Sequence, residues 1–394
     1  MEYTDVPFDA SAHRMLTVDE ARARLAATEP LQFFTFVTGP DEDSGEVRDI
    51  AVEYGDEWPL AGLTQAAPVW LSLPDTGIVQ LTRQAALQVG STCRVNQRFQ
   101  EFIPAGILSE IVLWALQSGL GTRELKMLTA GTGEHEGDEV PLVVAQTRAT
   151  VEPFSNVKLL DTIVAVVRRV CGDAVADGAW IDYKMFHDLE HTSFRVVLPL
   201  LQAVIGDEQA SNAWCYGIEI SNSLIGLKQT IISGYLFCLD STGGITDFEH
   251  GAGGFKRRGS TPEQAYAWTA EAVEEILGGI EVAFKGLAAL TEHSVDTDYR
   301  NVMAQLFREA PVAKELQLRI IADLEETPGT LTMYDLACAS SEAANLDGST
   351  WRDVRTLHDL AGTIVHQGGG MCDGTLPRGC RRLLPEDWEA DVSS

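Results

Sequence analysis

The chain has 394 residues, 45% of them hydrophobic, which is enough for one large domain or two moderate ones with a full core. Its 58 acidic residues outnumber its 29 basic residues and give a formal net charge of −29. This charge excludes a protein that coats DNA in general, because the acidic bulk repels phosphate at long range, but it allows a local basic groove. The acids are spread along the chain, which favours a solubility-adapted surface over a mimic of DNA.

Targeting segments and cysteine frameworks are missing from the sequence pattern. Residues 1–15 contain three acidic residues and no apolar core, so we expect no secretory signal. The best apolar stretch, from Ile103 to Leu116, is too short to cross a membrane and contains Glu110. Seven cysteines occur singly, which predicts reduced thiols in the core rather than disulfides or a zinc site. We therefore expect a cytoplasmic protein without a membrane partner.

The first third of the chain mixes helices and strands. Thr17 and Glu20 form the pattern of a capping box and predict a helix that begins there. Strands are expected over 49–54 and 69–73. A helix over 77–89, stopped by Gly90, and a second helix from Pro104 to about Ser118 should follow.

The middle of the chain is richer in strands. Segments 124–128 and 142–147 predict a hairpin with an acidic turn around 131–138. A helix is expected over 157–170 and a strand over 194–198. Segments 215–221 and 229–239 then predict a further pair of strands, joined by residues 221–227.

The last third is predicted to be helical. Thr261, Pro262 and Gln264 form a strong helix start, and the helix should run to about Leu290 with a kink at Gly278-Gly279. Further helices are expected over 299–308, 312–325, 332–344 and 350–365, with an irregular end over 368–394. The prediction is an α+β fold: antiparallel strands with packed helices, then a mostly helical C-terminal region. We divide it into a mixed region (1–250), a helical region (251–370) and an irregular acidic tail (371–394).

Two short motifs in this layout resemble a known family. Residues 217–226 combine a strand with an N-S-x-x-G turn, in which Asn222 and Ser223 can bond back to their own backbone and Gly226 permits a tight turn. The next strand ends near Cys238, and a basic segment followed by Gly259 comes later. In these features, and in the order of its elements over roughly 70–370, the chain resembles domain-of-unknown-function family 932.

The resemblance implies an origin in a phage, prophage or plasmid, and it implies no particular reaction. One departure concerns the stretch 146–156, which keeps Asn156 but lacks a tyrosine that the family often has there. Any role that depends on that ring is therefore in doubt for this chain.

The sharpest catalytic motif is His187-x-x-Glu190-His191, the inverted zinc-peptidase pattern, in which both histidines bind zinc and the glutamate activates water. That chemistry requires a helix, whereas 192–200 reads as a strand, so we favour a solvated turn. Walker A, dinucleotide and G-x-S-x-G fingerprints are absent from the sequence, and we expect no cofactor.

The best binding candidate is the glycine-flanked basic loop over 253–260, which contains Phe255, Lys256, Arg257 and Arg258. It lies directly before a predicted helix start, where free N–H groups and the positive end of the dipole favour phosphate, and Phe255 could stack on a base. Arg168-Arg169, and Arg123 with Lys126, could extend such a surface. The alternative is an ordinary surface loop that pairs with the chain's own acids.

The leading hypothesis is a non-catalytic mobile-element protein associated with nucleic acid. It would handle single-stranded DNA in replication or recombination and could assemble as a homo-oligomer. The first alternative is a structural or interaction protein that binds a protein partner through its acidic surface. The second is a zinc metallohydrolase that uses His187, Glu190 and His191.

Overall fold

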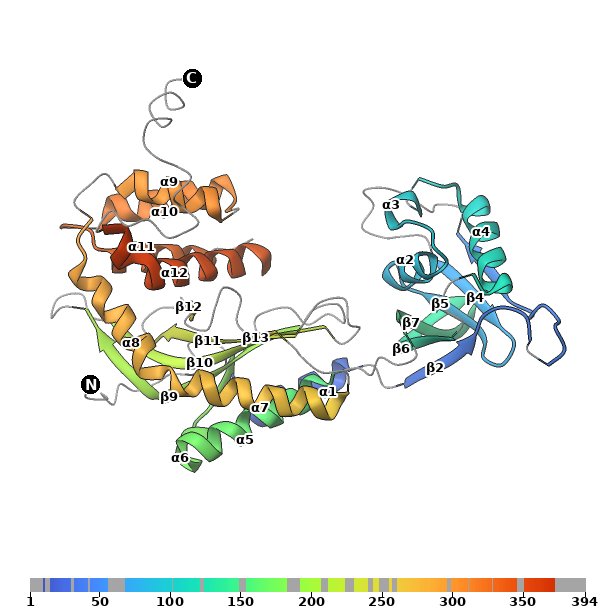
Figure 1. Cartoon of the computed structure of the whole chain (residues 1–394), viewed down its shortest axis with the longest axis horizontal. Helices are drawn as coiled ribbons and strands as arrows, with labels where there is room; N and C mark the ends of the chain where they lie inside the picture. Colours follow the sequence, from blue (N-terminus) through green and yellow to red (C-terminus); the bar gives the residue numbers. More distant parts are fainter. Residues whose placement is uncertain are drawn as a thin grey trace, which may run out of the picture.

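The computed structural model contains two β-sheets, each packed against helices (Figure 1). The described residues are Ala10 and residues 15–29, 32–41, 43–55, 68–100, 102–120, 124–148, 154–182, 192–206, 212–223, 230–239, 244–247, 255–256, 261–295, 299–310, 312–327, 329–345 and 351–372. Among them, every helix falls short of the length or apolar character that crossing a bilayer requires.

Sheet A has seven strands and forms the centre of the larger unit. Its strands, in spatial order, are β1 (Leu16–Thr17), β8 (Trp180–Asp182), β9 (Thr192–Ile205), β10 (Asn212–Asn222), β11 (Ile231–Cys238) and β12 (Gly244–Asp247), with β13 (Phe255–Lys256) also paired to β11. All neighbours are antiparallel. From β8 to β12 the spatial order follows the chain, which is the order of a meander.

Helices cover both faces of sheet A. Four lie on one face: α1 (Val18–Thr28), α5 (Asn156–Cys171), α6 (Asp173–Asp177) and α7 (Pro262–Gly278) (Figure 1). Four lie on the other: α9 (Tyr299–Glu309), α10 (Lys314–Glu326), α11 (Met333–Glu342) and α12 (Trp351–Cys372). The helix α8 (Ile280–Ala289) and the short turn η1 (Leu290–Glu292) connect the two layers, and η2 (Ala343–Asn345) extends α11.

Sheet B belongs to a smaller unit. Its strands, in spatial order, are β2 (Gln32–Val37), β6 (Glu124–His135), β7 (Asp138–Arg148), β5 (Gly77–Leu81), β4 (Val69–Leu73) and β3 (Ala51–Tyr54). The β5–β7 pair is parallel and the others are antiparallel. The helices α2 (Arg83–Thr92), α3 (Gln97–Gln100) and α4 (Ala105–Ser118) accompany this sheet (Figure 1).

The two units have separate hydrophobic cores. The core beside sheet A draws on Ala21 and Leu25 of α1 and then on residues from Phe154 to Ile364. The core beside sheet B uses residues between Phe36 and Val143. The smaller unit is thus inserted between α1 and α5 of the larger one. The predicted division at residue 250 falls inside the span of the larger core, and residues 373–394 of the predicted tail lie outside the described residues.

Glu29 ties together the two chain segments where the insertion begins and ends. Its carboxylate accepts hydrogen bonds from the Ser155 hydroxyl at 2.9 Å and from the Val157 backbone N–H at 2.9 Å. The end of α1 and the start of α5 are therefore held side by side, and the carboxylate also favours the N-terminus of α5 electrostatically.

The α+β class and most predicted elements are confirmed. Both predicted capping boxes are present, at Thr17 with Glu20 and at Thr261 with Gln264. The helix after Pro104, the hairpin of β6 and β7 and the pair β10–β11 are also present. The predicted kink at Gly278-Gly279 is the junction of α7 and α8. Cys93, Cys171, Cys215, Cys238 and Cys338 are free thiols.

Two predicted elements are wrong. The segment 77–89 is not one helix, because residues 77–81 alternate along β5 and pair with β4 and β7, and Thr82 then caps α2. The chain is not irregular from residue 368, because α12 continues to Cys372. Each helical glycine costs about 1 kcal/mol relative to alanine. Extending a helix that has already formed still adds one hydrogen bond per residue, which favours continuation.

Gly217→Ala should destabilise the larger unit. A Cβ atom at Gly217 would lie 2.6 Å from the carbonyl oxygen of Val196 on β9, so the β9 backbone would have to move. We expect a loss of about 1–3 kcal/mol in the free energy of unfolding, measured in urea. Gly278→Ala is the control, because its Cβ would meet no atom within 4 Å. Equal midpoints for the two variants would contradict the crowding at Gly217.

Candidate functional site

The structure describes the backbone of only part of the predicted basic loop. Phe255 and Lys256 form β13, in which Lys256 pairs with Ile231 and Phe255 with Ile232 of β11. Arg257, Arg258 and the rest of the loop over 253–260 lie outside the described residues. The helix α7 then begins at Pro262. Of the three predicted cations, only the backbone of Lys256 is therefore placed, in the strand that pairs with β11.

The start of α7 has fewer free donors than predicted. The Gln264 N–H donates to the Thr261 hydroxyl at 3.3 Å, and the Thr261 N–H donates to the Gln264 side chain at 3.4 Å. Pro262 has no N–H, so the Glu263 N–H is the first-turn donor without a partner among the described residues. The capping box thus uses two of the N–H groups that could otherwise contact a phosphate at this terminus.

The cations that could extend a basic surface are mostly engaged. The Arg168 Nη2 lies 2.6 Å from an Asp177 carboxylate oxygen, and the Arg169 Nη2 lies 2.8 Å from Glu274. Lys126 is buried, with its Nζ 3.9 Å from the centre of the Phe33 ring. Arg123 lies outside the described residues. None of the described members of this predicted surface is left as a free cation.

Asn222 of the predicted turn is buried, and its side-chain hydrogen bonds, which we call the Asn222 clamp, join three segments of the chain. Its Nδ2 donates to the Phe154 carbonyl oxygen at 2.7 Å and to the Asn156 side-chain oxygen at 2.8 Å. Its side-chain oxygen accepts from the Thr230 hydroxyl at 2.7 Å. The predicted bond back to its own backbone is thus replaced by bonds that join β10, the start of α5 and the start of β11. Ser223 is buried beside it, and Gly226 lies outside the described residues.

This clamp joins two parts of the family resemblance that are far apart in the sequence. Asn156, from the stretch that departs from the family pattern, contacts Asn222, from the stretch that fits it best. Both asparagine side chains are fully or almost fully buried. Their mutual bond indicates a structural role, because each satisfies a polar group of the other away from water.

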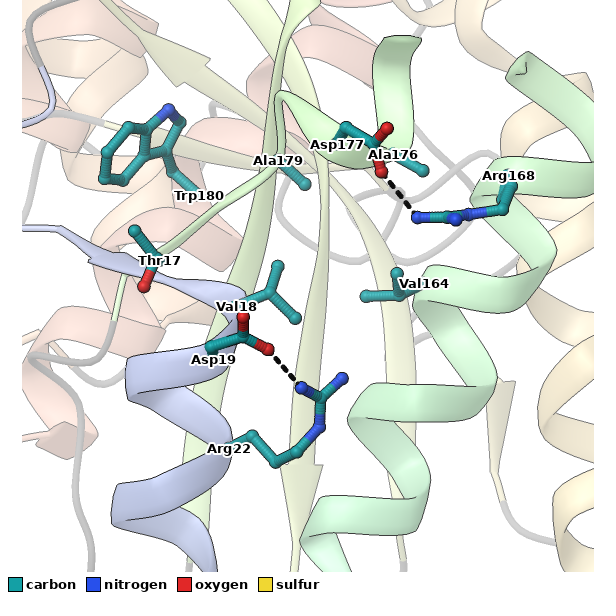
Figure 2. A pocket seen from close by; sticks show the side chains of 10 residues that line it. All are labelled: Thr17, Val18, Asp19, Arg22, Val164, Arg168, Ala176, Asp177, Ala179 and Trp180. Carbon is teal, nitrogen blue, oxygen red and sulfur yellow. Dashed lines mark hydrogen bonds and ion pairs between the residues drawn. The ribbon is translucent and has the colours of Figure 1, made fainter. Parts of the chain in front are cut away.

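A pocket of about 280 Å³ lies between α1, α5, α6 and β8 (Figure 2). Arg22 and Arg168 approach it from α1 and α5. Arg22 is paired with Asp19 and lies 2.8 Å from Asp161. The remaining lining residues are Thr17, Val18, Val164, Ala176, Asp177, Ala179 and Trp180. Because each guanidinium already has carboxylate partners, this pocket does not offer the unpaired charge of an anion site.

The zinc motif cannot be placed. His187, Glu190 and His191 belong to the connection between β8 and β9 and lie outside the described residues. Within the described part of the chain, no three His, Cys, Asp or Glu side chains are grouped as metal ligands would be. The zinc hypothesis stays a prediction.

The densest group of buried charges in the described chain surrounds Arg195 of β9. Its Nη1 lies 3.3 Å from Asp182 of β8, and its Nε lies 3.7 Å from Glu219 of β10. Its Nη2 donates to the Nδ1 of His358 on α12 at 2.7 Å. Its guanidinium carbon lies 4.0 Å from the centre of the Tyr235 ring on β11. All five residues are at most 5% exposed. We call this group the Arg195 cluster.

The electrostatics of the Arg195 cluster keep His358 neutral. Burial, and next the positive charge of Arg195, hold the pKa of His358 well below its usual range. Burial also raises the pKa of Tyr235, so this phenol stays protonated. The guanidinium therefore remains the cation that balances the two carboxylates and binds α12 to the sheet. No described pocket opens onto the cluster, and its evident role is structural.

Sequence analysis missed the Arg195 cluster. A signal was present, since Arg195 lies between Phe194 and Val196, and Glu219 lies between two isoleucines. Charged residues at such positions are seldom buried unless they are paired. The pairing itself depends on strand register and on the docking of α12, which single segments do not reveal.

His358→Asn should weaken the dependence of stability on pH. The unfolded chain binds a proton at this histidine near pH 6.5, whereas burial opposes protonation in the folded chain. The contribution of His358 to the free energy of unfolding is therefore complete above about pH 6.5 and is lost as the pH falls. Asparagine keeps an acceptor near the Nδ1 position but does not titrate. Urea unfolding between about pH 5 and pH 8 gives the free energy of unfolding at each pH. Its slope against pH should be steeper for the parent than for His358→Asn by up to about 1.4 kcal/mol per pH unit.

His293→Asn is the control, because this partly exposed side chain lies outside the Arg195 cluster. If His358→Asn and the parent lose stability in parallel on acidification, His358 is not the group that links stability to pH.

Comparison with known proteins leaves the chain unassigned. No family model matches it, and no match was found among curated proteins or solved structures. The resemblance to domain-of-unknown-function family 932 therefore stays a prediction, and function must be argued from the residues themselves.

Proposed function

We propose that this chain is a non-catalytic protein associated with nucleic acid, which handles single-stranded DNA during replication or recombination of a mobile element. The basic loop at β13 supplies cations for phosphate, with Phe255 next to them for stacking on a base. Binding is local, because the net charge of −29 opposes a broad interface.

The pairing of cations elsewhere in the larger unit supports this proposal. Five exposed cations there have a nearby carboxylate partner: Arg168 has Asp177, Arg169 has Glu274, Lys285 has Glu281, Arg300 has Glu325 and Arg319 has Asp323. A cation with a carboxylate partner releases few counterions when it meets phosphate. The sequence of this unit also contains three consecutive cations, from Lys256 to Arg258. The residues on either side of this segment include glycines rather than acids.

Neutralising Lys256, Arg257 and Arg258 to glutamine should weaken binding to single-stranded DNA. Removing up to about three phosphate contacts lowers the slope of log affinity against log salt by roughly two units, at about 0.7 per contact for single strands. The measurement is fluorescence anisotropy of a labelled oligonucleotide across a salt series.

The matched control neutralises the paired cations Lys285, Arg300 and Arg319 to glutamine. This control removes the same formal charge from the same unit but leaves the basic loop intact. Its slope of log affinity against log salt should therefore stay close to that of the parent. Equal slopes for the two triple variants would show that the loop has no special role. A parent that binds no single strand at low salt, and instead recovers a protein partner, would support the acidic interaction protein.

Metal analysis tests the zinc metallohydrolase separately. If His187, Glu190 and His191 bind zinc, the purified chain contains about one zinc per molecule and His187→Ala loses it. Mass spectrometry of the intact folded chain under native conditions, with and without a chelator, measures this directly. A parent chain without zinc after expression in zinc-supplemented medium would end this hypothesis.

A further inference from the structure

Four large aromatic or apolar side chains on α3, α4 and the turn between them are exposed. Phe99 of α3 is 59% exposed, and Phe102, in the turn that follows, is 77% exposed. On α4, Ile107 is 53% exposed and Trp114 is 61% exposed. Singly exposed apolar residues are ordinary, but several on two adjoining helices indicate an interaction surface.

The packing of α3 fixes the outward direction of its aromatic residue. The side chain of Gln100 is buried, and its Nε2 donates to the carbonyl oxygens of Leu87 at 3.1 Å and Val95 at 2.9 Å. Gly90 makes room for it, because a Cβ there would lie 2.2 Å from the Gln100 side-chain oxygen. With Gln100 anchored inward, the neighbouring Phe99 is held in solvent.

The helix α4 is apolar on two sides. Leu108, Val112, Ala115 and Leu116 are buried and face the core. Ile107 and Trp114 are seven residues apart, so they share another side of the helix, about 10 Å apart along its axis. Large apolar side chains on the exposed side of a helix can mark an interaction site. The exposed side of α4 is therefore suited to contact with a binding partner.

The charge of this region identifies the partner. Residues 83–120 contain three arginines and two glutamates, a net charge of +1 in a chain of net charge −29. Arg94 and Arg98 are exposed, and neither forms an ion pair with a described residue. Arg98 directly precedes Phe99, and Arg94 lies five residues before Phe99 in the sequence. Free guanidinium groups beside exposed rings suit a polyanion with aromatic faces of its own.

We propose that Arg94, Arg98, Phe99, Phe102, Ile107 and Trp114, which we call the α3–α4 surface, bind single-stranded nucleic acid. Phe99, Phe102 and Trp114 stack on bases, and Arg94 and Arg98 contact phosphates. A duplex is a poor partner, because its bases already stack on one another and hide their faces. The inference rests on the proposed function and adds a second binding surface, in the other unit from the basic loop.

Glu110 determines on which side of this surface the backbone of the nucleic acid lies. It is exposed and lies three residues after Ile107, on the side of α4 that carries Trp114. Its carboxylate repels phosphate, so the backbone of the strand lies toward Arg94 and Arg98 while the bases lie over the apolar side chains.

The test compares aromatic and cationic variants in the full-length chain, with a labelled oligo-dT strand as the probe. Phe99→Ala with Phe102→Ala should weaken binding roughly 5- to 150-fold for each base that loses its stacking partner, with the salt slope unchanged. Arg94→Gln with Arg98→Gln should lower the salt slope by about 1.4. Glu110→Gln should strengthen binding. These side chains are exposed, so the variants should fold, which unfolding in urea verifies.

Phe33→Ala is the matched control, because this phenylalanine is 60% exposed in the same unit but lies on β2. If the parent binds and the basic-loop variant weakens binding while Phe99→Ala with Phe102→Ala does not, the α3–α4 surface is refuted and the proposed function stands. If the aromatic variant weakens binding and the loop variant does not, the surface is supported and the loop is not. A parent without affinity at low salt refutes both.

Two further outcomes would overturn the α3–α4 surface alone. An equal loss of affinity for duplex and single-stranded probes would show that the aromatic residues do not stack on bases. A change in self-association of the aromatic variant in sedimentation, with oligo-dT affinity unchanged, would show that the surface joins two copies of the chain instead.

Discussion

Arg195 holds the larger unit together because it is the cation on which three strands and a late helix converge. Its guanidinium faces Asp182 on β8 and Glu219 on β10, covers the ring of Tyr235 on β11 and donates to His358 on α12. Removing one partner from such a buried group leaves the others as uncompensated charges or dipoles, which costs far more than an exposed ion pair would. The helical layer of α9–α12 is thus joined to sheet A by a polar contact as well as by apolar packing. This contact also explains why the interior of the sheet is unsuitable as a binding site, since its charges are already matched to one another.

The same balance of charge explains where binding can occur on the surface. In this acidic chain several cations at the surface have carboxylate partners, as Arg22 and Arg168 do at the pocket and as Arg169 does with Glu274. A phosphate can compete only where the acids are sparse. In sequence, the segments of the two proposed sites, the basic loop and the α3–α4 surface, contain more cations than acids, and they belong to different units with separate cores. Two modest sites on one chain gain avidity for a strand long enough to reach both.

Local signals in the sequence predicted much of the fold. The capping boxes at Thr17 and Thr261, and the glycine pair after α7, depend on residues a few positions apart, and each predicted feature is present. The segment 77–81 was misread because its strand character depends on pairing with β4 and β7. Asn222 was expected to close a local turn, whereas its partners lie 66 and 68 residues away. Most of the stretch from Ile103 to Leu116 was correctly predicted to lie in a helix, and the stretch was judged too short for a membrane span. Its exposed side could not be predicted, because that side is defined by which part of α4 the core covers.

The insertion of the sheet B unit between α1 and α5 also affects how the chain is synthesised. The helix α1 leaves the ribosome early, but the groups it packs on, such as Asp161 opposite Arg22, lie 139 residues later. The intervening unit is continuous in sequence and has its own core, so it can fold before the residues of α5 that pack against α1 have been synthesised. The order of folding is therefore the reverse of the order of synthesis at this junction. Until α5 emerges, the apolar side of α1 is exposed in the nascent chain, and slow translation of the sheet B unit prolongs that exposure.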